Sequence, residues 1–176
     1  TVVGVGREDG KTAGEYAPIF FKQAKYTLLD QNTFWLCEKP DSVGMVGWDA
    51  ALTRIATWVK LQDKKTGQIL MVVNTHFDHI GTEARRNSAL LIIEKIKEIV
   101  GTSPAILTGD FNVSEDWDAY KTITNNEFIL KDAHKVAGKR TGVDFTYHNF
   151  GKIPAEKCEK IDFIFVTPQI RVISSY

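Results

Sequence analysis

Apolar and polar residues alternate in the middle of the chain, and this pattern predicts a pair of adjacent strands. Over residues 53–61 the side chains form two alternating sets, one of them made of Ile55, Thr57, Val59 and Leu61. A period of two is typical of a β-strand, whose successive side chains point to opposite faces. A polar turn at residues 63–67 and an apolar run at residues 69–75 follow. We therefore predict a β-hairpin.

A different spacing predicts a long helix over residues 83–100. Its apolar residues recur at steps of three and four positions, which places them along one helical face: Ala89, Ile92, Ile93, Ile96 and Val100. Thr82 is the expected N-cap, and Gly101 stands where the helix should stop. A second, shorter helix is predicted over residues 117–124, where Glu115 and Asp116 favour the positive end of the helix dipole.

Short strands are expected before and after the second helix, over residues 105–108 and 161–166. Strands that alternate with helices favour an α/β fold, in which helices cover sheets. The length of 176 residues suits one domain over residues 1–176 and allows a substantial buried core.

Composition adds few constraints. The chain is 43% hydrophobic and 25% charged, which is typical of a soluble globular protein. No apolar run approaches the roughly 20 residues of a membrane-spanning helix. Lys plus Arg (22) equals Asp plus Glu (22), so the whole chain has no electrostatic attraction for nucleic acid. Cys37 and Cys158 are too few for a disulfide framework or a cysteine zinc site, although a single bridge between them stays open.

The first candidate for chemistry is the segment Gly-Asp-Phe-Asn at residues 109–112, which follows a predicted strand. Residues two apart on an extended chain point to the same side, so we expect the side chains of Asp110 and Asn112 to converge. Their oxygens can bind a hard cation, or position a phosphate and an attacking water. Because Gly, Asp and Asn also favour turns, a turn that ends the strand is the alternative interpretation.

The second candidate is the polar cluster that ends the strand at residues 69–75. His76 can donate a proton to a phosphoryl oxygen or stabilise its charge, although a single histidine is more often structural. His76 and His79 together can also suggest a zinc site, but their spacing of three suits a helix and the preceding run predicts a strand.

Weaker candidates are isolated charged or aromatic residues. Asp162 lies between apolar residues on a predicted strand, where it either faces solvent or holds a histidine ring in position. Arginine suits phosphate oxygens because its guanidinium bonds them in pairs. The remaining candidates for substrate binding in this region, each also compatible with an ordinary surface or core role, are Trp48, Asp49, Arg54 and Arg85.

The order of these segments resembles the endonuclease/exonuclease/phosphatase superfamily over nearly the whole chain. The resemblance is sharpest in Asn-Thr-His-Phe-Asp-His at residues 74–79, Thr-Gly-Asp-Phe-Asn at residues 108–112 and Ile-Asp-Phe-Ile-Phe at residues 161–165. Two N-terminal segments, residues 4–10 and 14–21, are similar to a bacterial branch of that superfamily. The resemblance implies a four-layer α/β sandwich, in which two mixed β-sheets are flanked by helices, incomplete here at its N- and C-terminal strands.

The same resemblance implies hydrolysis of phosphodiesters or phosphomonoesters with Mg²⁺ or Mn²⁺. His76 would interact with the scissile phosphate, and Asp110 would orient or deprotonate the attacking water. Asn112 would hold the phosphate or the metal, so Asp110 and Asn112 are the expected metal ligands of this chain. Asp162 matches the family carboxylate that orients a catalytic histidine or assists the metal site.

Two parts of the family pattern are absent from residues 1–176: a strand ending in Gln-Glu, whose glutamate is the principal metal ligand, and a Ser-Asp-His segment. We therefore expect an internal portion of a longer protein, with little turnover by itself. The alternatives are a binding module of the same fold that has lost its chemistry, and a zinc hydrolase using His76 and His79.

The substrate is expected to be a short oligonucleotide, a nucleotide or another small phosphoester, because the neutral charge of the chain disfavours binding to long duplex DNA. The protein is expected to be a monomer. The segment at residues 144–148 precedes the Asp162 strand, and we expect it to form part of the substrate rim through Thr146 and His148. Four aromatic residues either stack on a base or belong to the core: Tyr16, Trp48, Phe145 and Tyr147.

Overall fold

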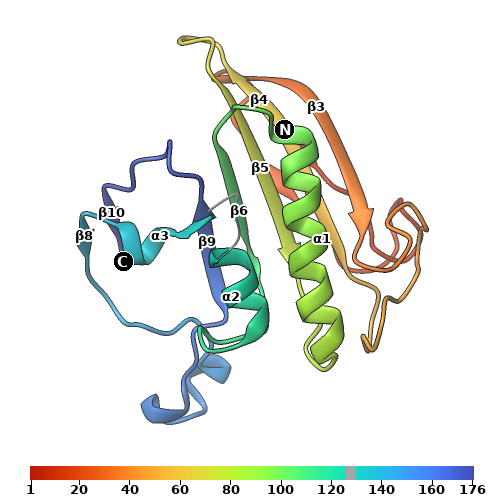
Figure 1. Ribbon diagram of the computed structural model, residues 1–176, viewed down its shortest axis with the longest axis vertical. Helices are drawn as coiled ribbons and strands as arrows, with labels where there is room; N and C mark the ends of the chain where they lie inside the picture. The colour runs from red at the N-terminus through yellow and green to blue at the C-terminus, as the bar shows by residue number, and fades with distance from the viewer. Residues whose placement is uncertain (126–129) are drawn as a thin grey trace.

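A six-stranded mixed sheet forms the centre of the molecule (Figure 1). The computed structural model describes residues 1–125 and 130–176. The strand order is β3-β4-β5-β6-β9-β7, with bounds β3 Tyr26–Trp35, β4 Ile55–Asp63, β5 Ile69–His76, β6 Ala105–Asp110, β7 Lys131–Asp132 and β9 Asp162–Val166. β5 and β6 run parallel, and every other neighbouring pair is antiparallel. The predicted β4–β5 hairpin and the α/β architecture with a mixed sheet are confirmed.

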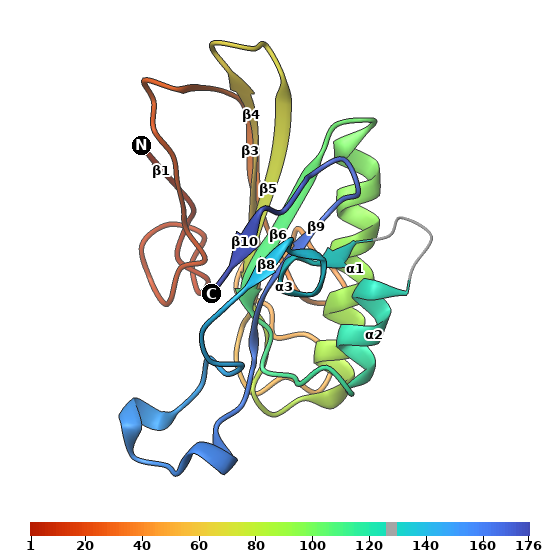
Figure 2. The same cartoon turned by 90° about the vertical axis from the view of Figure 1, so that its left-hand side faces the viewer.

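Two helices, α1 (Thr82–Val100) and α2 (Asp118–Thr124), cover one face of this sheet (Figures 1 and 2). The apolar stripe predicted for α1 is buried against the sheet, and the main core forms between them. Every fully buried methylene there contributes about 0.8 kcal/mol. Of the helices in the described part of the chain, none combines the length and hydrophobicity that a bilayer crossing requires.

The opposite face of the sheet carries two small two-stranded sheets. One consists of β1 (Val2–Val3) and β2 (Ile19–Phe20), the other of β8 (Lys139–Arg140) and β10 (Ser174–Ser175). Figure 2 shows both on the side away from α1 and α2. Val3 and Ile19 pack on Val59 and Leu61, so a second apolar layer holds the β1–β2 pair in place.

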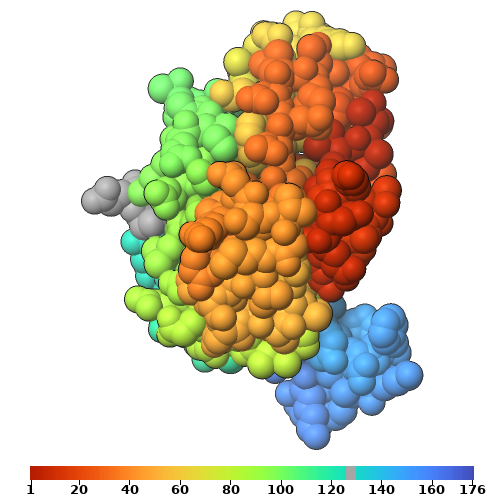
Figure 3. Space-filling model, turned by 90° about the vertical axis from the view of Figure 1, so that its right-hand side faces the viewer, coloured from red at the N-terminus to blue at the C-terminus, as the bar shows by residue number. Residues whose placement is uncertain are grey.

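The segment between β8 and β9 leaves the body of the molecule as a projection, visible at the lower edge of Figure 3. It contains two 3-10 turns, Asn149–Gly151 and Ala155–Lys157. A third helix, α3 (Ala133–Val136), directly follows β7. An isolated bridge between Tyr147 and Glu159 closes the base of the projection, so the chain returns to β9 next to the point where it left.

The start of α1 differs from the prediction. Thr82 is already helical, and Gly81 is the N-cap. The cap interaction comes from a distant loop, because the Asp49 carboxylate accepts hydrogen bonds from the backbone N–H groups of Ala84 (2.7 Å) and Glu83 (3.3 Å). A Cβ on Gly81 would lie 2.6 Å from Asp49 Oδ1, so this close approach requires glycine. Gly101 does end the helix, with a φ of 59°.

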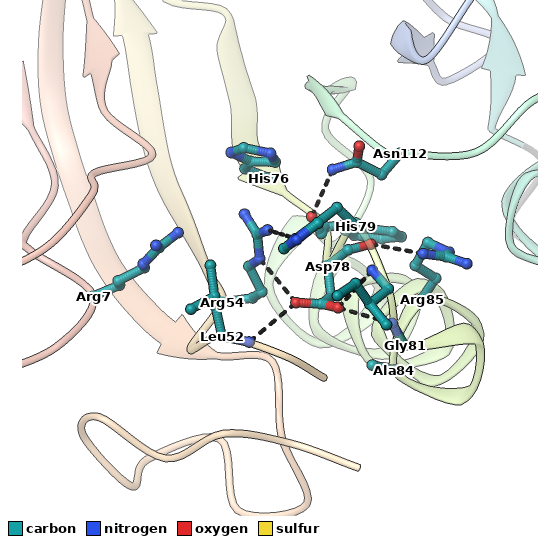
Figure 4. Close-up of polar contacts among 12 residues, drawn as sticks. Arg7, Leu52, Arg54, His76, Asp78, His79, Gly81, Ala84, Arg85 and Asn112 are labelled. Carbon is teal, nitrogen blue, oxygen red and sulfur yellow. Dashed lines mark hydrogen bonds and ion pairs between the residues drawn. The ribbon is translucent and has the colours of Figure 1, made fainter. Parts of the chain in front are cut away.

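A buried carboxylate joins this helix start to the neighbouring loops (Figure 4). Asp78 is 1% exposed and accepts hydrogen bonds from the backbone of Gly81 (2.8 Å), Ile80 (2.9 Å) and Leu52 (3.2 Å). Arg54 Nε lies 3.4 Å from the same carboxylate. Burial opposes ionisation of Asp78, but the hydrogen bonds from Gly81 and Ile80 hold its pKa well below the ordinary value.

We predict that Asp78→Asn lowers the free energy of unfolding by about 3 kcal/mol, because it removes one partner of a buried ion pair and turns an amide NH₂ toward backbone donors. Urea denaturation at pH 7 measures the change, with the exposed Asp30→Asn as the matched control. Because the folded-state pKa of Asp78 is depressed, the stabilisation persists above its ordinary pKa of 3.8 and declines as the pH falls below that value. Equal stability of Asp78→Asn and Asp30→Asn would contradict this account.

Candidate functional site

Three predicted site residues, His76, Asp110 and Asp162, form one row across three adjacent strands. His76 ends β5 and pairs with Asp110 at the end of β6, and Asp110 pairs with Asp162 at the start of β9. Residues directly opposite each other in a sheet point to the same face. The structure thus brings together three side chains that the family resemblance assigns to one site, and they lie on the face away from α1.

The residue after each member of the row is a buried phenylalanine. Phe77 and Phe111 are fully buried and Phe163 is 4% exposed. The ring of Phe111 lies 4.9 Å from that of Phe77 and 6.0 Å from that of Phe163, both edge to face. Because side chains alternate across a strand, burying each ring under the helices turns its polar neighbour to the opposite face.

Two negative groups lie side by side in this row. Burial raises the pKa of Asp110, and the charge of Asp162 adds to this effect. The hydrogen bond that Asp110 Oδ1 accepts from Asn112 N (2.9 Å) and the nearby His76 oppose the rise in pKa. His76 Nε2 lies 3.5 Å from Asp110 Oδ2. Asp110 is therefore a carboxylate that gains from a nearby positive charge.

Glu15 belongs to the site and was not predicted. Its Oε1 lies 3.0 Å from His76 Nδ1, and its Oε2 accepts from Arg7 Nη1 at 2.7 Å. Partial burial opposes ionisation of Glu15, but the hydrogen bond and charge of His76 lower its pKa overall. Glu15 and His76 are 61 residues apart in the chain, so spacing alone gives no signal for the pair. With a carboxylate at Nδ1, that nitrogen carries a proton, and Nε2 faces Asp110.

Asn112 has a different geometry from the predicted one. Its φ of 48° takes it out of the extended conformation, so the alternation along a strand that the prediction assumed does not place its side chain. Asn112 N donates to Asp110 Oδ1, and Asn112 Nδ2 donates to the carbonyl oxygen of Phe77 at 3.0 Å. Asn112 thereby ties the end of β6 to the end of β5 (Figure 4). Sequence reasoning missed this because the tie depends on the pairing of two strands.

A cavity of about 740 Å³ opens over the row. The three residues of the row line it, and so do residues of the loop between β1 and β2, of α3, of the predicted rim and of the segment before β9. These further lining residues include Tyr16, His134, Asp144, Phe145, Thr146 and Lys160. Thr146 Oγ1 accepts hydrogen bonds from the backbone N–H groups of Ile161 and Asp162, both at 3.1 Å. The prediction that residues 144–148 border the site holds for residues 144–146.

Four predicted substrate contacts lie outside this cavity lining and have structural partners. Asp49 caps α1, and Trp48 N donates to Glu38 Oε1. Arg85 Nη1 donates to the carbonyl of Asp78, and its guanidinium stacks 4.7 Å from the ring of Trp117. His148 Nδ1 accepts from Gly151 N at 2.8 Å, within the projection. These residues stabilise the loops around the site.

Arg54 has an intermediate position. It is 4% exposed and is bonded to Asp78 and to His79 Nδ1 (3.1 Å), while Nη1 is buried without a hydrogen-bond partner in the described part of the chain. It lines a narrow crevice together with Arg7, Glu15 and His76. The charge of Arg54 lowers the pKa values of both Glu15 and Asp110. Arg54 thus lies next to His76 outside the main cavity lining, and its positive charge stabilises the ionised forms of Glu15 and Asp110.

The geometry does not favour the zinc alternative. His79 Nδ1 faces the guanidinium of Arg54, whereas His76 faces Glu15 and Asp110. Within residues 1–125 and 130–176, no group of three His, Cys, Asp or Glu side chains is placed to hold a metal ion. Cys37 and Cys158 are both free, so the bridge left open by the sequence is not formed.

The oxygen donors of the row do match the chemistry of a hard divalent cation. Asp110 and Asp162 are paired directly, and the repulsion between their charges contributes to the raised pKa of Asp110. A cation bound between them would relieve that repulsion, and Mg²⁺ prefers carboxylate oxygens. These two carboxylates would form part of a coordination shell.

Comparison with known proteins gives a consistent result. No protein-family model matches the chain. A crystal structure of an endonuclease/exonuclease/phosphatase from Bacteroides vulgatus is 68% identical, with a TM-score of 0.97, over 99% of this chain and 67% of that one. A mannosyl-6-phosphatase from Bacteroides thetaiotaomicron is 39% identical, with a TM-score of 0.92, over 99% of this chain and 65% of that one.

A curated, uncharacterized protein from Acanthamoeba polyphaga mimivirus is 36% identical over 127 residues, which are 68% of this chain and 46% of that protein. The chain therefore spans about two thirds of the length of the Bacteroides structures and less than half of the viral relative. The Bacteroides vulgatus protein shares 68% of its aligned residues with this chain and has the same fold. This chain therefore belongs to the endonuclease/exonuclease/phosphatase family.

Proposed function

We propose that the protein hydrolyses phosphoester bonds with the help of Mg²⁺ or Mn²⁺, and that the row His76–Asp110–Asp162 is its reaction centre. The observation that carries the proposal is the register of β5, β6 and β9, which brings an imidazole and two carboxylates together over a cavity. The relation to a mannosyl-6-phosphatase at 39% identity supports phosphoester hydrolysis and favours a phosphomonoester.

The roles follow from the atoms that face the cavity. Asp110 accepts a proton from the attacking water, because its carboxylate lines the cavity beside His76. The water oxygen bonds to phosphorus while the bond from phosphorus to the leaving oxygen breaks, and the leaving oxygen takes up a proton from solvent to form the free alcohol. His76, protonated on both ring nitrogens, donates its Nε2–H to a phosphoryl oxygen and stabilises the growing charge there, while its Nδ1–H stays bonded to Glu15. A divalent cation bound at Asp110 and Asp162 would supply further charge neutralisation.

Glu15 is proposed as a positioning residue for His76. The carboxylate of Glu15 holds the ring at Nδ1 and is itself held by Arg7 on the other oxygen. A ring fixed in this way keeps its Nδ1 proton and one orientation, which is the usual effect of a carboxylate bonded to a functional histidine.

Asp110→Asn is expected to lower kcat of the full-length protein at least about a hundredfold, because the amide cannot accept the proton. Asparagine keeps an oxygen for the hydrogen bond from Asn112, so the fold is retained. Phosphate release from a generic phosphomonoester or phosphodiester measures the effect, with the exposed Asp116→Asn as the control. A rate close to that of the wild type would remove Asp110 from its proposed role.

Glu15→Gln is expected to lower kcat roughly 10–100-fold with little change in KM, because the ring of His76 loses its charged partner while the substrate contacts remain. The exposed Glu8→Gln, in the same loop, is the control. If Glu15 serves only to stabilise the loop, Glu15→Gln changes thermal stability and leaves kcat unaltered.

Removal of divalent cations tests the proposed cofactor. Chelation with EDTA followed by dialysis is expected to abolish phosphate release, and Mg²⁺ or Mn²⁺ is expected to restore it. Activity that survives chelation would contradict a magnesium-type site. A protein that binds phosphoesters without releasing phosphate under any of these conditions would instead be the binding module considered from the sequence.

A further inference from the structure

The cavity over the site row extends well beyond the place where a phosphate would react. Its volume of about 740 Å³ lies in the range that holds a whole small-molecule ligand. Beyond the row it is bordered by α3, by the rim segment and by the start and end of the last strands, including His134, Asp144, Lys160 and Ser175. Lys160 lies two residues before Asp162 in the chain, so this far end adjoins the reaction centre.

His134 is held so that one ring nitrogen stays free for a ligand. Its Nδ1 is bonded to Ser175 Oγ at 2.9 Å, and its backbone N–H donates to Asp132 Oδ1 at 2.8 Å. The other nitrogen, Nε2, lies 3.9 Å from Asp144 Oδ1, which exceeds the length of a direct hydrogen bond. The ring is therefore held at Nδ1, and its Nε2 lies beside Asp144, which lines the same end of the cavity.

Lys160 and Asp144 complete a mixed set of donors and acceptors. Lys160 is 13% exposed, and its Nζ lies 3.3 Å from Glu115, 3.5 Å from Asp132 and 3.8 Å from Asp144. The Asp144 side chain is 79% exposed, and its distance from Lys160 Nζ is the longest of the three. Its carboxylate thus keeps free lone pairs between an ammonium group and an imidazole.

Such a set suits hydroxyl groups. A hydroxyl both donates and accepts a hydrogen bond, so a pair of neighbouring hydroxyls can donate to the Asp144 carboxylate and accept from Lys160 or His134. The rings of Tyr16, Phe145 and Tyr176 also line the cavity and offer apolar faces to the C–H groups of a ring.

The charge of the cavity argues against a second phosphate. Its lining contains the carboxylates Asp110, Asp132, Asp144 and Asp162, but Lys160 is the single Lys or Arg among the described lining residues. A nucleic-acid backbone needs several cations along its path. One phosphate can be neutralised by a divalent ion at the row, whereas further phosphates would meet carboxylates.

We propose that His134, Asp144 and Lys160 form a subsite for a neutral, hydroxyl-rich leaving group, so that the preferred substrate is a phosphomonoester of a polyhydroxy compound. This inference rests on the proposed function and adds the part of the substrate that the far end of the cavity recognises. His134 and Asp144 are then specificity-determining residues that leave the reacting atoms untouched.

The test compares two esters of similar size with the full-length protein and Mg²⁺: a hexose 6-phosphate and n-hexyl phosphate. The wild type is expected to have a kcat/KM for the hexose ester at least about tenfold higher, the value of roughly one hydrogen bond to a charged group. Asp144→Ala and His134→Ala are each expected to lower that value about tenfold, mainly through KM, and to leave n-hexyl phosphate within about twofold.

Asp41→Ala, an exposed aspartate outside the cavity lining, is the matched control and should leave both esters unchanged. Equal kcat/KM for the two esters, an equal loss for both esters in Asp144→Ala, or a preference for a single-stranded oligonucleotide would overturn the subsite. If neither ester is hydrolysed, the proposed function fails on its own. Calorimetric binding then tests the subsite: tighter binding of the hexose ester that is lost in Asp144→Ala supports it, and equal binding overturns it.

Discussion

The register of three strands, β5, β6 and β9, is the constraint on which the site depends. A shift of one residue in either pairing would turn every side chain of that strand to the other face. The three buried rings that follow the site residues oppose such a shift, because Phe77, Phe111 and Phe163 fill one cluster beneath the helices. Burying each ring contributes about 1.5–3 kcal/mol, and the same burial holds His76, Asp110 and Asp162 on the opposite face.

A second set of interactions supports this register from the side of the loops. Asp78 follows the end of β5, and Arg54 directly precedes β4. The ion pair between them is buried. The backbone groups that bond to Asp78 belong to the loop before α1 and to the loop before β4. Arg54 in turn borders the Glu15–His76 pair. The guanidinium of Arg54, which lies next to the Glu15–His76 pair, is thus held by Asp78, the same residue that binds the backbone at the start of α1.

Local pattern was sufficient to predict much of the fold and part of the site. The alternation before residue 61 and the helical spacing after residue 83 correspond to β4 and α1, because each depends on neighbours within a few positions. Ordered motifs were enough to select His76, Asp110 and Asp162. The partners that come from distant segments were not predictable: Asp49 caps α1 across 35 positions, and Glu15 meets His76 across 61. Arg85 and Trp48 lie outside the cavity lining, and local pattern could not show this, because their contacts also come from the folded chain.

The central claim is that the row itself binds the phosphate and the cation. It is tested most directly by a crystal structure of the full-length protein soaked with Mn²⁺ and inorganic phosphate, with anomalous data collected at the manganese edge. The account predicts an anomalous peak within bonding distance of the Asp110 or Asp162 carboxylate and a phosphate within hydrogen-bond distance of His76. A manganese peak bound elsewhere, with the phosphate away from His76, would contradict it.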